Sequence, residues 1–226
     1  MSENIRVAID GPSGAGKSTL ARSVAARLNF LYVDTGAIYR TIGYAVWRKG
    51  IDPRDRSAVV AVLPDLEICL TYGTDGLQHM ELNGMDVTAE IRLPEVSRYA
   101  SLVSAYPEVR AYLLEMQRQL ARENSVVMDG RDIGTVVLPD ATVKIFLTAS
   151  PEARATRRWK EYQAKGIDTP YEEGLADVKQ RDYQDTHRAA APLKQAEDAV
   201  LLDTSELDFE QSLDAMKQII AKKIGG

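Results

Sequence analysis

The stretch Gly11-Pro12-Ser13-Gly14-Ala15-Gly16-Lys17-Ser18-Thr19 decides the fold of this chain. It matches in full the pattern of glycine, four residues of any type, glycine, lysine, and then serine or threonine. The branched apolar run 5–9 before it predicts a buried strand. After it, Leu20, Val24 and Leu28 recur every four residues and predict one face of a helix. A glycine-rich turn that binds nothing is the alternative, and the full motif in this context argues against it. The stretch therefore predicts a site for a nucleoside triphosphate.

Each part of this glycine loop has an expected task. Its backbone N–H groups and the start of the following helix would surround the phosphates of the nucleotide. Lys17, on a loop that we expect to be exposed, would reach the β- and γ-phosphates, and the Ser18 hydroxyl would ligate Mg²⁺. All nine residues of the stretch are candidate ATP-binding residues.

The composition of the chain excludes several other classes of protein. Its 226 residues suffice for one α/β domain with insertions or for two small domains. A net charge of −5 argues against a general nucleic-acid-binding protein. The single cysteine, Cys69, excludes an internal disulfide and suits a reducing compartment. The N-terminus does not resemble a signal peptide, and no apolar stretch approaches the about 18 residues that span a bilayer. We expect a cytoplasmic protein without a membrane segment.

Strand and helix patterns alternate along much of the chain, which is typical of a parallel α/β sheet. A strand at 30–33 precedes a helix from about 37 to 49, which ends at Gly50. Further apolar runs at 125–128, 143–147 and 199–202 predict three more strands. Helices are expected from Pro151, with Ser150 as the N-cap, and over 208–222. The chain thus predicts a five-stranded core.

Two segments interrupt this alternation. The runs 66–70 and 77–82 alternate in hydrophobicity, and Asn83-Gly84 is a strong hairpin turn signal, so they predict a small inserted antiparallel sheet. Pro94 and Pro107 would each open a helix. The second of these helices would bury Val109, Leu113, Met116 and Leu120. The segment Arg154–Arg188 is charged and weakly periodic, which predicts an exposed and mobile region.

Two glycine-containing loops follow strands, where ligands bind in open α/β sheets. The first is Asp34-Thr35-Gly36-Ala37-Ile38-Tyr39-Arg40. In it, Asp34 would hold a Mg²⁺-bound water and Arg40 would reach a second phosphate, but capping of the next helix explains Asp34 equally well. The second is Asp129-Gly130-Arg131-Asp132-Ile133-Gly134, where Asp129 resembles a Walker-B carboxylate. Turn chemistry explains its glycines but not its cluster of charges, which favours a functional loop.

The remaining polar residues narrow the chemistry. Arg181, Asp185 and Arg188 would share one face of a helix, an arrangement equally expected of a solvated, salt-bridged helix. There are only two histidines, with no cluster suited to zinc and no nucleophile elbow. No general base is evident either. A phosphate monoester, with a second pKa of about 6, is already ionised at neutral pH and needs none, so a phosphate acceptor is favoured.

Taken in order, these motifs resemble those of bacterial cytidylate kinases. The resemblance rests on the glycine loop and on the segments 34–40, 129–137, 143–147 and 181–193, and it covers nearly the whole chain. It implies an α/β P-loop nucleoside monophosphate kinase fold, with a five-stranded parallel sheet flanked by helices. The implied core is about 1–34, 103–150 and 190–226. The implied monophosphate-binding insertion, with its small antiparallel sheet, is about 35–102, and the helical lid about 151–189.

The resemblance also implies an activity, which is transfer of the γ-phosphoryl group of Mg-ATP to CMP or dCMP. Carried over by position, Arg40, Arg131 and Arg188 would clamp the acceptor phosphate; Ser101, Arg110 and Asp132 would read cytosine; Arg181 and Asp185 would contact the ribose; and Arg157 and Arg158 would be lid arginines that approach ATP. Thr35 stands where a serine is also common and keeps the hydroxyl. Lys17, Asp129, Arg131 and Arg188 would be catalytic, and Ser18 would hold Mg²⁺, with Asp34 and Asp129 acting through water.

Other functions remain as alternatives from the sequence. The chain could be a P-loop kinase for another acceptor, such as UMP, AMP or shikimate, or a nucleotide-binding switch or sensor without transfer activity. No Asn-Lys-x-Asp guanine-reading sequence is present, which argues against a GTPase-like switch. Lys17, Arg131 and Arg188 argue against an inert binder. The resemblance further implies a monomer, and neither nucleic acid nor membrane is expected as a partner.

Overall fold

The structure, a computed structural model, describes residues 4–74, 76–164, 166 and 168–225. The chain divides into two compact units. One unit comprises the chain up to Tyr32 and from Ala121 onward, and the other is Val33–Leu120. Among the described residues, no helix is long and apolar enough to cross a membrane.

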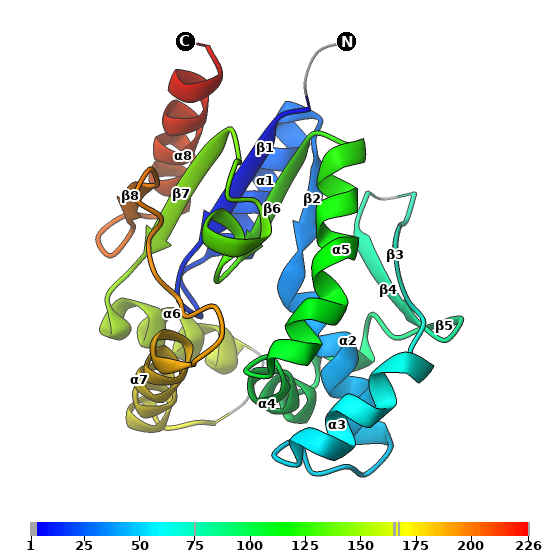
Figure 1. Cartoon of the computed structure of the whole chain (residues 1–226). Helices are drawn as coiled ribbons and strands as arrows, with labels where there is room; N and C mark the ends of the chain where they lie inside the picture. Colours follow the sequence, from blue (N-terminus) through cyan, green and yellow to red (C-terminus); the bar gives the residue numbers. More distant parts are fainter. Residues whose placement is uncertain (1–3, 75, 165, 167, 226) are drawn as a thin grey trace. The chain divides into compact units, whose positions relative to one another are not determined.

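A five-stranded sheet with the order β2-β6-β1-β7-β8 carries the glycine loop (Figure 1). Its strands are β1 (Arg6–Asp10), β2 (Leu31–Asp34), β6 (Val126–Gly130), β7 (Val143–Thr148) and β8 (Val200–Asp203). β1 runs parallel to β6 and to β7, with Asp10 paired to Gly130 on one side and Phe146 on the other. All of β6 and Val7–Asp10 of β1 are buried, as expected for the central strands of a parallel sheet that is covered on both faces. The predicted five-stranded core is confirmed.

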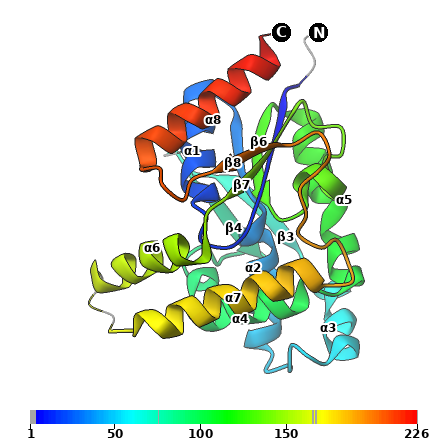
Figure 2. The ribbon, with the colours of Figure 1, turned by 90° about the vertical axis from the view of Figure 1, so that its left-hand side faces the viewer.

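Helices α1 (Lys17–Leu28) and α8 (Phe209–Ile224) pack on each other and on the sheet (Figure 2). Leu20 and Val24 join the core cluster with the strand residues Ile9 and Ile145. Leu28, predicted on the same helix face, is the last residue of α1 and is 36% exposed. The closing helix agrees with its prediction and begins at a capping box.

Helices α6 (Pro151–Ala164) and α7 (Tyr171–His187) lie side by side (Figure 2). The Ser150 hydroxyl accepts a hydrogen bond from Ala153 N–H at 3.1 Å, so the predicted N-cap is confirmed. Most of this pair is exposed or half-buried, but Arg154 is 2% exposed, which contradicts the prediction of an exposed segment at that position. The helix α7 ends at His187 and Arg188 has an extended backbone, so Arg188 does not lie on the predicted helical face.

Within its described residues, the unit Val33–Leu120 contains the three strands of the inserted sheet, three complete α-helices and most of a fourth. They are α2 (Thr35–Arg48), α3 (Arg56–Val62), β3 (Ile68–Tyr72), β4 (Gln78–Leu82), β5 (Met85–Asp86), α4 (Pro94–Val103) and the start of α5 (Pro107–Glu123). The three strands are antiparallel, and both Asn83 and Gly84 have positive φ at the turn, as a tight hairpin requires. The predicted insertion is therefore confirmed. The helix α3, capped by Asp55, was not predicted.

Two close packings shape this unit. A Cβ atom on Gly43 of α2 would lie 2.7 Å from the backbone nitrogen of Ala100, so only glycine lets α2 and α4 approach this closely. On α5, Val109 and Leu113 are buried as predicted. Met116 and Leu120 are only half-buried, and Gln117 is buried instead, donating to the Leu113 carbonyl at 3.0 Å. The helix is therefore turned slightly from the face that its apolar spacing predicted.

Candidate functional site

The glycine loop follows β1 and lies against the end of β7. Gly11 has φ of +154°, and a Cβ atom there would stand 1.9 Å from the Leu147 carbonyl oxygen, so no other residue fits. Gly16, also at positive φ, leads directly into α1 at Lys17. The loop thus brings a helix N-terminus and its N–H groups to the carboxyl edge of the sheet, where anions bind.

Lys17 is 5% exposed, so it is buried rather than exposed as expected. Its Nζ donates a hydrogen bond to the Pro12 carbonyl at 2.7 Å. Burial, reinforced by the positive charge of Arg131, lowers the pKa of Lys17 to about 7, although Asp129, Asp185 and Asp10 oppose this change. The amine is therefore held inside the glycine loop, where the negative charge of a bound polyphosphate would favour its ammonium form.

Asp129 is the residue before the last of β6 and lies beside the glycine loop, as the Walker-B resemblance predicted. It is 3% exposed, and its Oδ2 accepts a hydrogen bond from the Ser18 hydroxyl at 3.0 Å. Its Oδ1 accepts another from the Tyr32 hydroxyl at 2.8 Å. Tyr32 was not singled out from the sequence, because only the pairing of β2 with β6 brings it near Asp129. The carboxylate is thereby held in one orientation, with one of its oxygens facing the loop serine.

This donor set fits Mg²⁺. Ser18 and Asp129 offer a hydroxyl and a carboxylate, the oxygen ligands that the ion prefers. Across the described residues, no group of three or more His, Cys, Asp or Glu side chains is suited to a metal. Mg²⁺ usually takes one or two protein oxygens and completes its shell with phosphate oxygens and water, so two ligands are enough.

Four of the predicted acceptor residues lie together in the first unit. Arg131 Nε donates to Asp185 Oδ2 at 2.7 Å, and Arg188 Nη2 approaches Asp132 Oδ1 at 3.5 Å. Burial opposes ionisation of Asp185, but Arg131 and Arg188 outweigh it and hold the pKa of that carboxyl below its usual range. These residues come from the loop after β6 and from the end of α7, so the structure joins two motifs that are about fifty residues apart in sequence.

Asp10, the last residue of β1, was not singled out from the sequence. It is 4% exposed, and its two carboxylate oxygens accept hydrogen bonds from Ile133 N–H and Gly134 N–H, both at 2.7 Å. Burial raises the pKa of Asp10 to about 6, although the two N–H groups act in the opposite direction. An acidic residue at the end of a buried strand, directly before the glycine loop, was the signal that could have indicated it.

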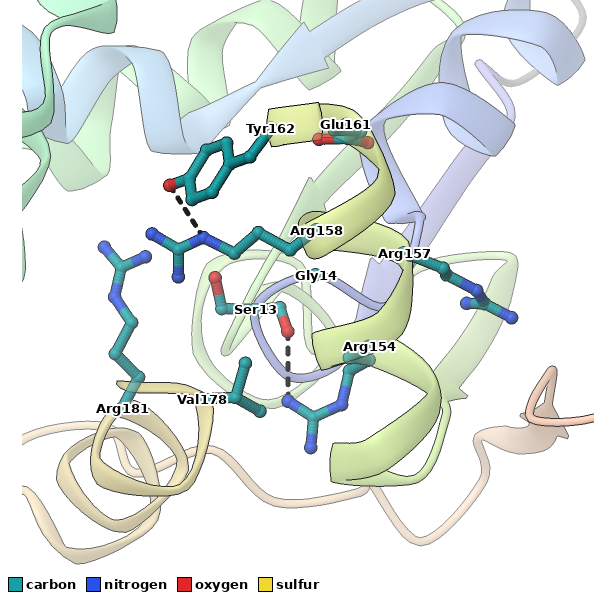
Figure 3. Close-up of a pocket in the computed structure, with 9 residues that line it drawn as sticks. All are labelled: Ser13, Gly14, Arg154, Arg157, Arg158, Glu161, Tyr162, Val178 and Arg181. Atoms are coloured by element: carbon teal, nitrogen blue, oxygen red, sulfur yellow. Dashed lines mark hydrogen bonds between the residues drawn. The ribbon is translucent and has the colours of Figure 1, made fainter. Parts of the chain in front are cut away.

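Arginines surround a cavity of about 250 Å³ beside the glycine loop (Figure 3). It is lined by Ser13, Gly14, Arg154, Arg157, Arg158, Glu161, Tyr162, Val178 and Arg181. Arg158 and Arg181 extend toward each other, whereas Arg157 points away from them (Figure 3) and donates to Thr204. Burial, together with the charges of Arg158 and Arg131, lowers the pKa of Arg181. This concentration of guanidinium groups suits a polyphosphate.

Arg154 joins three elements at the base of this cavity. Its guanidinium donates to the Ser13 carbonyl at 3.0 Å (Figure 3) and to the Ala149 carbonyl at 2.8 Å. It also forms a two-pronged ion pair with Asp182 of α7, at 2.9 and 2.5 Å. Neither Arg154 nor Asp182 was assigned a role from the sequence. Together they fix the glycine loop and α7 relative to the start of α6.

In the other unit, three predicted site residues lie at or near the start of α2. Thr35 opens α2 and is buried. Asp34 caps α2 by accepting from Ala37 N–H at 2.9 Å, so the capping alternative is observed. Its Oδ2 also forms ion pairs with Arg40 and Arg92, each at 3.1 Å. Burial opposes ionisation of Asp34, but these two arginines outweigh it and lower its pKa. Arg92 was not singled out from the sequence.

Ser101 and Arg110, the other predicted residues of this unit, lie on α4 and α5. Arg110 donates to the Ser104 carbonyl at 3.1 Å, and its guanidinium stands 5.2 Å from the centre of the Tyr39 ring. Gln78 of β4 binds the backbone of Asp34 in both directions, accepting from its N–H at 2.7 Å and donating to its carbonyl at 3.2 Å. The inserted sheet is thus tied to the start of α2, which carries Arg40.

A glycine loop that leads from a parallel strand into a helix, with a carboxylate at the end of the neighbouring strand, is how P-loop kinases hold a triphosphate. The fold and this geometry place the chain in that class.

Comparison with known proteins narrows the class to one family. A family model described as cytidylate kinase matches residues 7–222. The cytidylate kinase of Desulfitobacterium hafniense (strain Y51) is 48% identical over 224 residues, which cover 99% of this chain and 96% of that protein. That of Carboxydothermus hydrogenoformans is 48% identical over 219 residues, covering 97% of this chain and 98% of that protein. The chain belongs to the cytidylate kinase family.

A likeness to a solved structure agrees with this fold. A crystal structure of an uncharacterized protein from Eubacterium ventriosum aligns with a TM-score of 0.52 at 14% identity and covers 99% of each chain. At that identity the likeness concerns the fold alone.

Proposed function

We propose that this protein transfers the γ-phosphoryl group of ATP to CMP or dCMP and releases ADP with CDP or dCDP. The observation that carries the proposal is 48% identity to cytidylate kinases along nearly the whole chain. The alternatives, another small acceptor or a switch without transfer activity, are not favoured by these relatives. We also propose a monomer that works in the cytoplasm, with no nucleic acid or membrane as partner.

On the donor side, the glycine loop holds ATP through its backbone N–H groups. The Lys17 ammonium exchanges the Pro12 carbonyl for the β- and γ-phosphates, and Arg157 and Arg158 contribute further positive charge. Ser18 would hold Mg²⁺, with Asp34 and Asp129 acting through water. When bound, the ion would neutralise negative charge that develops on the phosphates during transfer.

On the acceptor side, Arg131 and Arg188 clamp the phosphate of CMP. A guanidinium has five N–H donors, so Arg131 keeps its bond to Asp185 while it donates to a phosphate. Asp132 reads cytosine, and Asp185 and Arg181 contact the ribose. The acceptor phosphate is already ionised at neutral pH, so no general base is needed. Thr35, Arg40, Ser101 and Arg110 of the unit Val33–Leu120 remain predicted contacts of the acceptor.

An acceptor panel tests the proposal. ADP release from ATP is measured with CMP, dCMP, UMP, AMP and shikimate in turn. We expect the highest kcat/KM with CMP or dCMP, because hydrogen-bonding groups arranged for the cytosine edge are left unpaired by other bases. A higher value with another acceptor would assign the chain to a different kinase. Binding of ATP without ADP release for any acceptor would support a switch or sensor.

Two variants separate the roles on the acceptor side. Arg131→Ala should lower kcat/KM for every monophosphate acceptor, whatever its base. Asp132→Ala should lower kcat/KM for CMP and dCMP selectively, by about tenfold or more, since a hydrogen bond to a charged group is worth about 1.5–3 kcal/mol. Asp140→Ala, which changes a carboxylate with 67% side-chain exposure, is the matched control. Equal losses on CMP and UMP in Asp132→Ala would refute base reading by this residue.

A further inference from the structure

The carboxylate of Asp10 links the strand before the glycine loop to the loop that carries Arg131 and Asp132. Both of its oxygens are used, one for Ile133 N–H and one for Gly134 N–H. These two residues begin a short π-helix, Ile133–Val137, directly after Asp132. The hydrogen bonds are short at 2.7 Å, as expected when the acceptor is charged.

The π-helix depends on this outside partner. The first N–H groups of any helix lack an acceptor within the helix, and a side chain usually supplies one. Asp132, at the N-cap position, makes no such bond and has an irregular backbone with φ of −148° and ψ of 27°. Asp10, at the end of β1, supplies the acceptor for both N–H groups. The direction in which the chain leaves Arg131 and Asp132 is therefore set by Asp10.

The charges around Asp10 belong to both halves of the reaction site. The negative charge of Asp132 raises the pKa of Asp10 and the positive charge of Lys17 lowers it, while Asp10 itself acts to raise the pKa of Arg131. The side chain of Lys144 lies against Gly134, but its Nζ is directed to Asp198 at 2.8 Å. The carboxylate thus interacts electrostatically with the lysine of the glycine loop and bonds to the backbone of the loop that carries Arg131 and Asp132.

We propose that Asp10 is a positioning residue that holds Arg131 and Asp132 in place for the acceptor without touching either substrate. The inference rests on the acceptor roles given to these two residues above. It extends the task of β1, which carries the glycine loop for ATP and also fixes the loop for CMP through its last side chain. Substituting Asp10 should therefore affect the acceptor far more than the donor.

Asp10→Asn tests this with little change in shape. The new amide places an N–H₂ group where an oxygen accepted a backbone N–H, so one of the two bonds is lost. We expect the Kd and the KM for CMP to rise by about tenfold, while the Kd for ATP changes by less than about twofold. The exposed substitution Asp140→Asn is the control. Amide exchange should quicken at Ile133 and Gly134 in Asp10→Asn but not in α8.

A second variant and a pH profile address the same bond. A Cβ atom on Gly134 would stand 3.2 Å from Lys144 Cδ and 3.3 Å from Asp10 Oδ2, so Gly134→Ala crowds the Asp10 carboxylate together with the flexible Lys144 side chain. Gly134→Ala should also raise the Kd for CMP, without raising the Kd for ATP. Protonation of Asp10 below pH about 6 removes its charge, so the ratio of wild-type to Asp10→Asn affinity for CMP should narrow from pH 7 to pH 5. Because CMP itself titrates equally for both proteins, its own protonation cancels in that ratio.

The possible outcomes are distinguishable. Equal losses of ATP and CMP affinity in Asp10→Asn, or a lower thermal midpoint with unchanged CMP affinity, would overturn the inference and make Asp10 a structural residue of the core. Arg131→Ala and Asp132→Ala are measured in parallel. If both bind CMP normally, the proposed acceptor roles fail and the inference falls with them, whatever exchange shows at Ile133 and Gly134. If both variants bind CMP more weakly while Asp10→Asn binds it normally, the acceptor roles stand and only the inference about Asp10 fails.

Discussion

At the residue scale, the charged side chains of the site are buried more deeply than is usual for their types. Lys17 is 5% exposed and Asp129 is 3% exposed, whereas lysine and aspartate are mostly found at the surface. Each has a hydrogen-bond partner inside the protein, which offsets part of the desolvation cost. A negatively charged ligand would offset more of the desolvation cost of burying Lys17.

Lys17→Ala should lower kcat by about 100-fold or more, because the ammonium acts most strongly on charge that develops in the transition state. The fold should persist. Removal of a buried ammonium relieves its desolvation cost while it loses packing, so we expect a change of unfolding free energy within about 1 kcal/mol, or about 2–4 °C in thermal midpoint. Steady-state kinetics and thermal unfolding measure both effects. Near-wild-type turnover in a folded variant would refute the role.

The lowered pKa of Lys17 predicts proton uptake on ATP binding. With a pKa of about 7, roughly half of the amines are neutral at pH 7. The phosphates favour the ammonium and raise that pKa, so binding of Mg-ATP should take up a proton in part of the molecules. The uptake should shrink as the pH falls to 5.5, where the free protein is already protonated. Calorimetry in buffers of different ionisation enthalpy measures it.

Lys17→Arg is the control for this measurement, because a guanidinium stays charged throughout this pH range. Its proton uptake should be close to zero at pH 7. The same uptake in both proteins would show that another group titrates.

At the element scale, the close contact of α2 and α4 depends on the missing side chain of Gly43. Gly43→Ala should lower the free energy of unfolding by about 1–3 kcal/mol, because its Cβ meets backbone rather than a flexible side chain. Gly174→Ala on α7 is the matched control, since a Cβ there meets nothing within 4 Å. It should stabilise the protein by about 0.5–1 kcal/mol. Urea unfolding of both variants gives the comparison, and a Gly43→Ala variant as stable as Gly174→Ala would contradict the packing argument.

The pair α6 and α7 should exchange its amide hydrogens faster without ligands than with an ATP analogue and CMP. It buries few apolar side chains, with Ala155 and Val178 as the buried ones, so beyond the ion pair of Arg154 with Asp182 little apolar packing holds it in place. Hydrogen exchange followed by mass spectrometry measures this, with α8 as the internal reference. Exchange that is equally slow in both states would show that the lid is already fixed.

At the scale of the whole molecule, local patterns predicted most of the elements. Apolar runs, proline starts and the Asn83-Gly84 turn each act over a few residues, so they could be recognised without knowledge of the neighbours. The helix α3 was missed although Asp55 caps it, because seven residues are too few for a clear period. The strand order was beyond reach, since β1 pairs with strands more than one hundred residues away.

The candidate site followed the same division. The glycine loop and Asp129 could be found from sequence, because their spacing relative to a strand is itself the signal. Tyr32 and Arg154 could not, since each acts through a partner that only the folded chain brings near. The place of Asp10 directly before the glycine loop was a usable signal, but its partners Ile133 and Gly134 were not visible in the sequence. The separate tasks of Arg131 and Asp132 came from family resemblance alone. They remain predictions that the acceptor panel will test.

The strand order of the main sheet also has a consequence for how the chain is made. The ribosome releases β1 and its glycine loop early, but both neighbours of β1 lie at Val126–Gly130 and Val143–Thr148. At about 5–20 residues per second, the loop waits on the order of 10 s for the strands that hold it. Val33–Leu120 is continuous in sequence and emerges complete during that interval. We therefore expect the inserted unit to fold first, and the ATP site to form only once synthesis has passed β7.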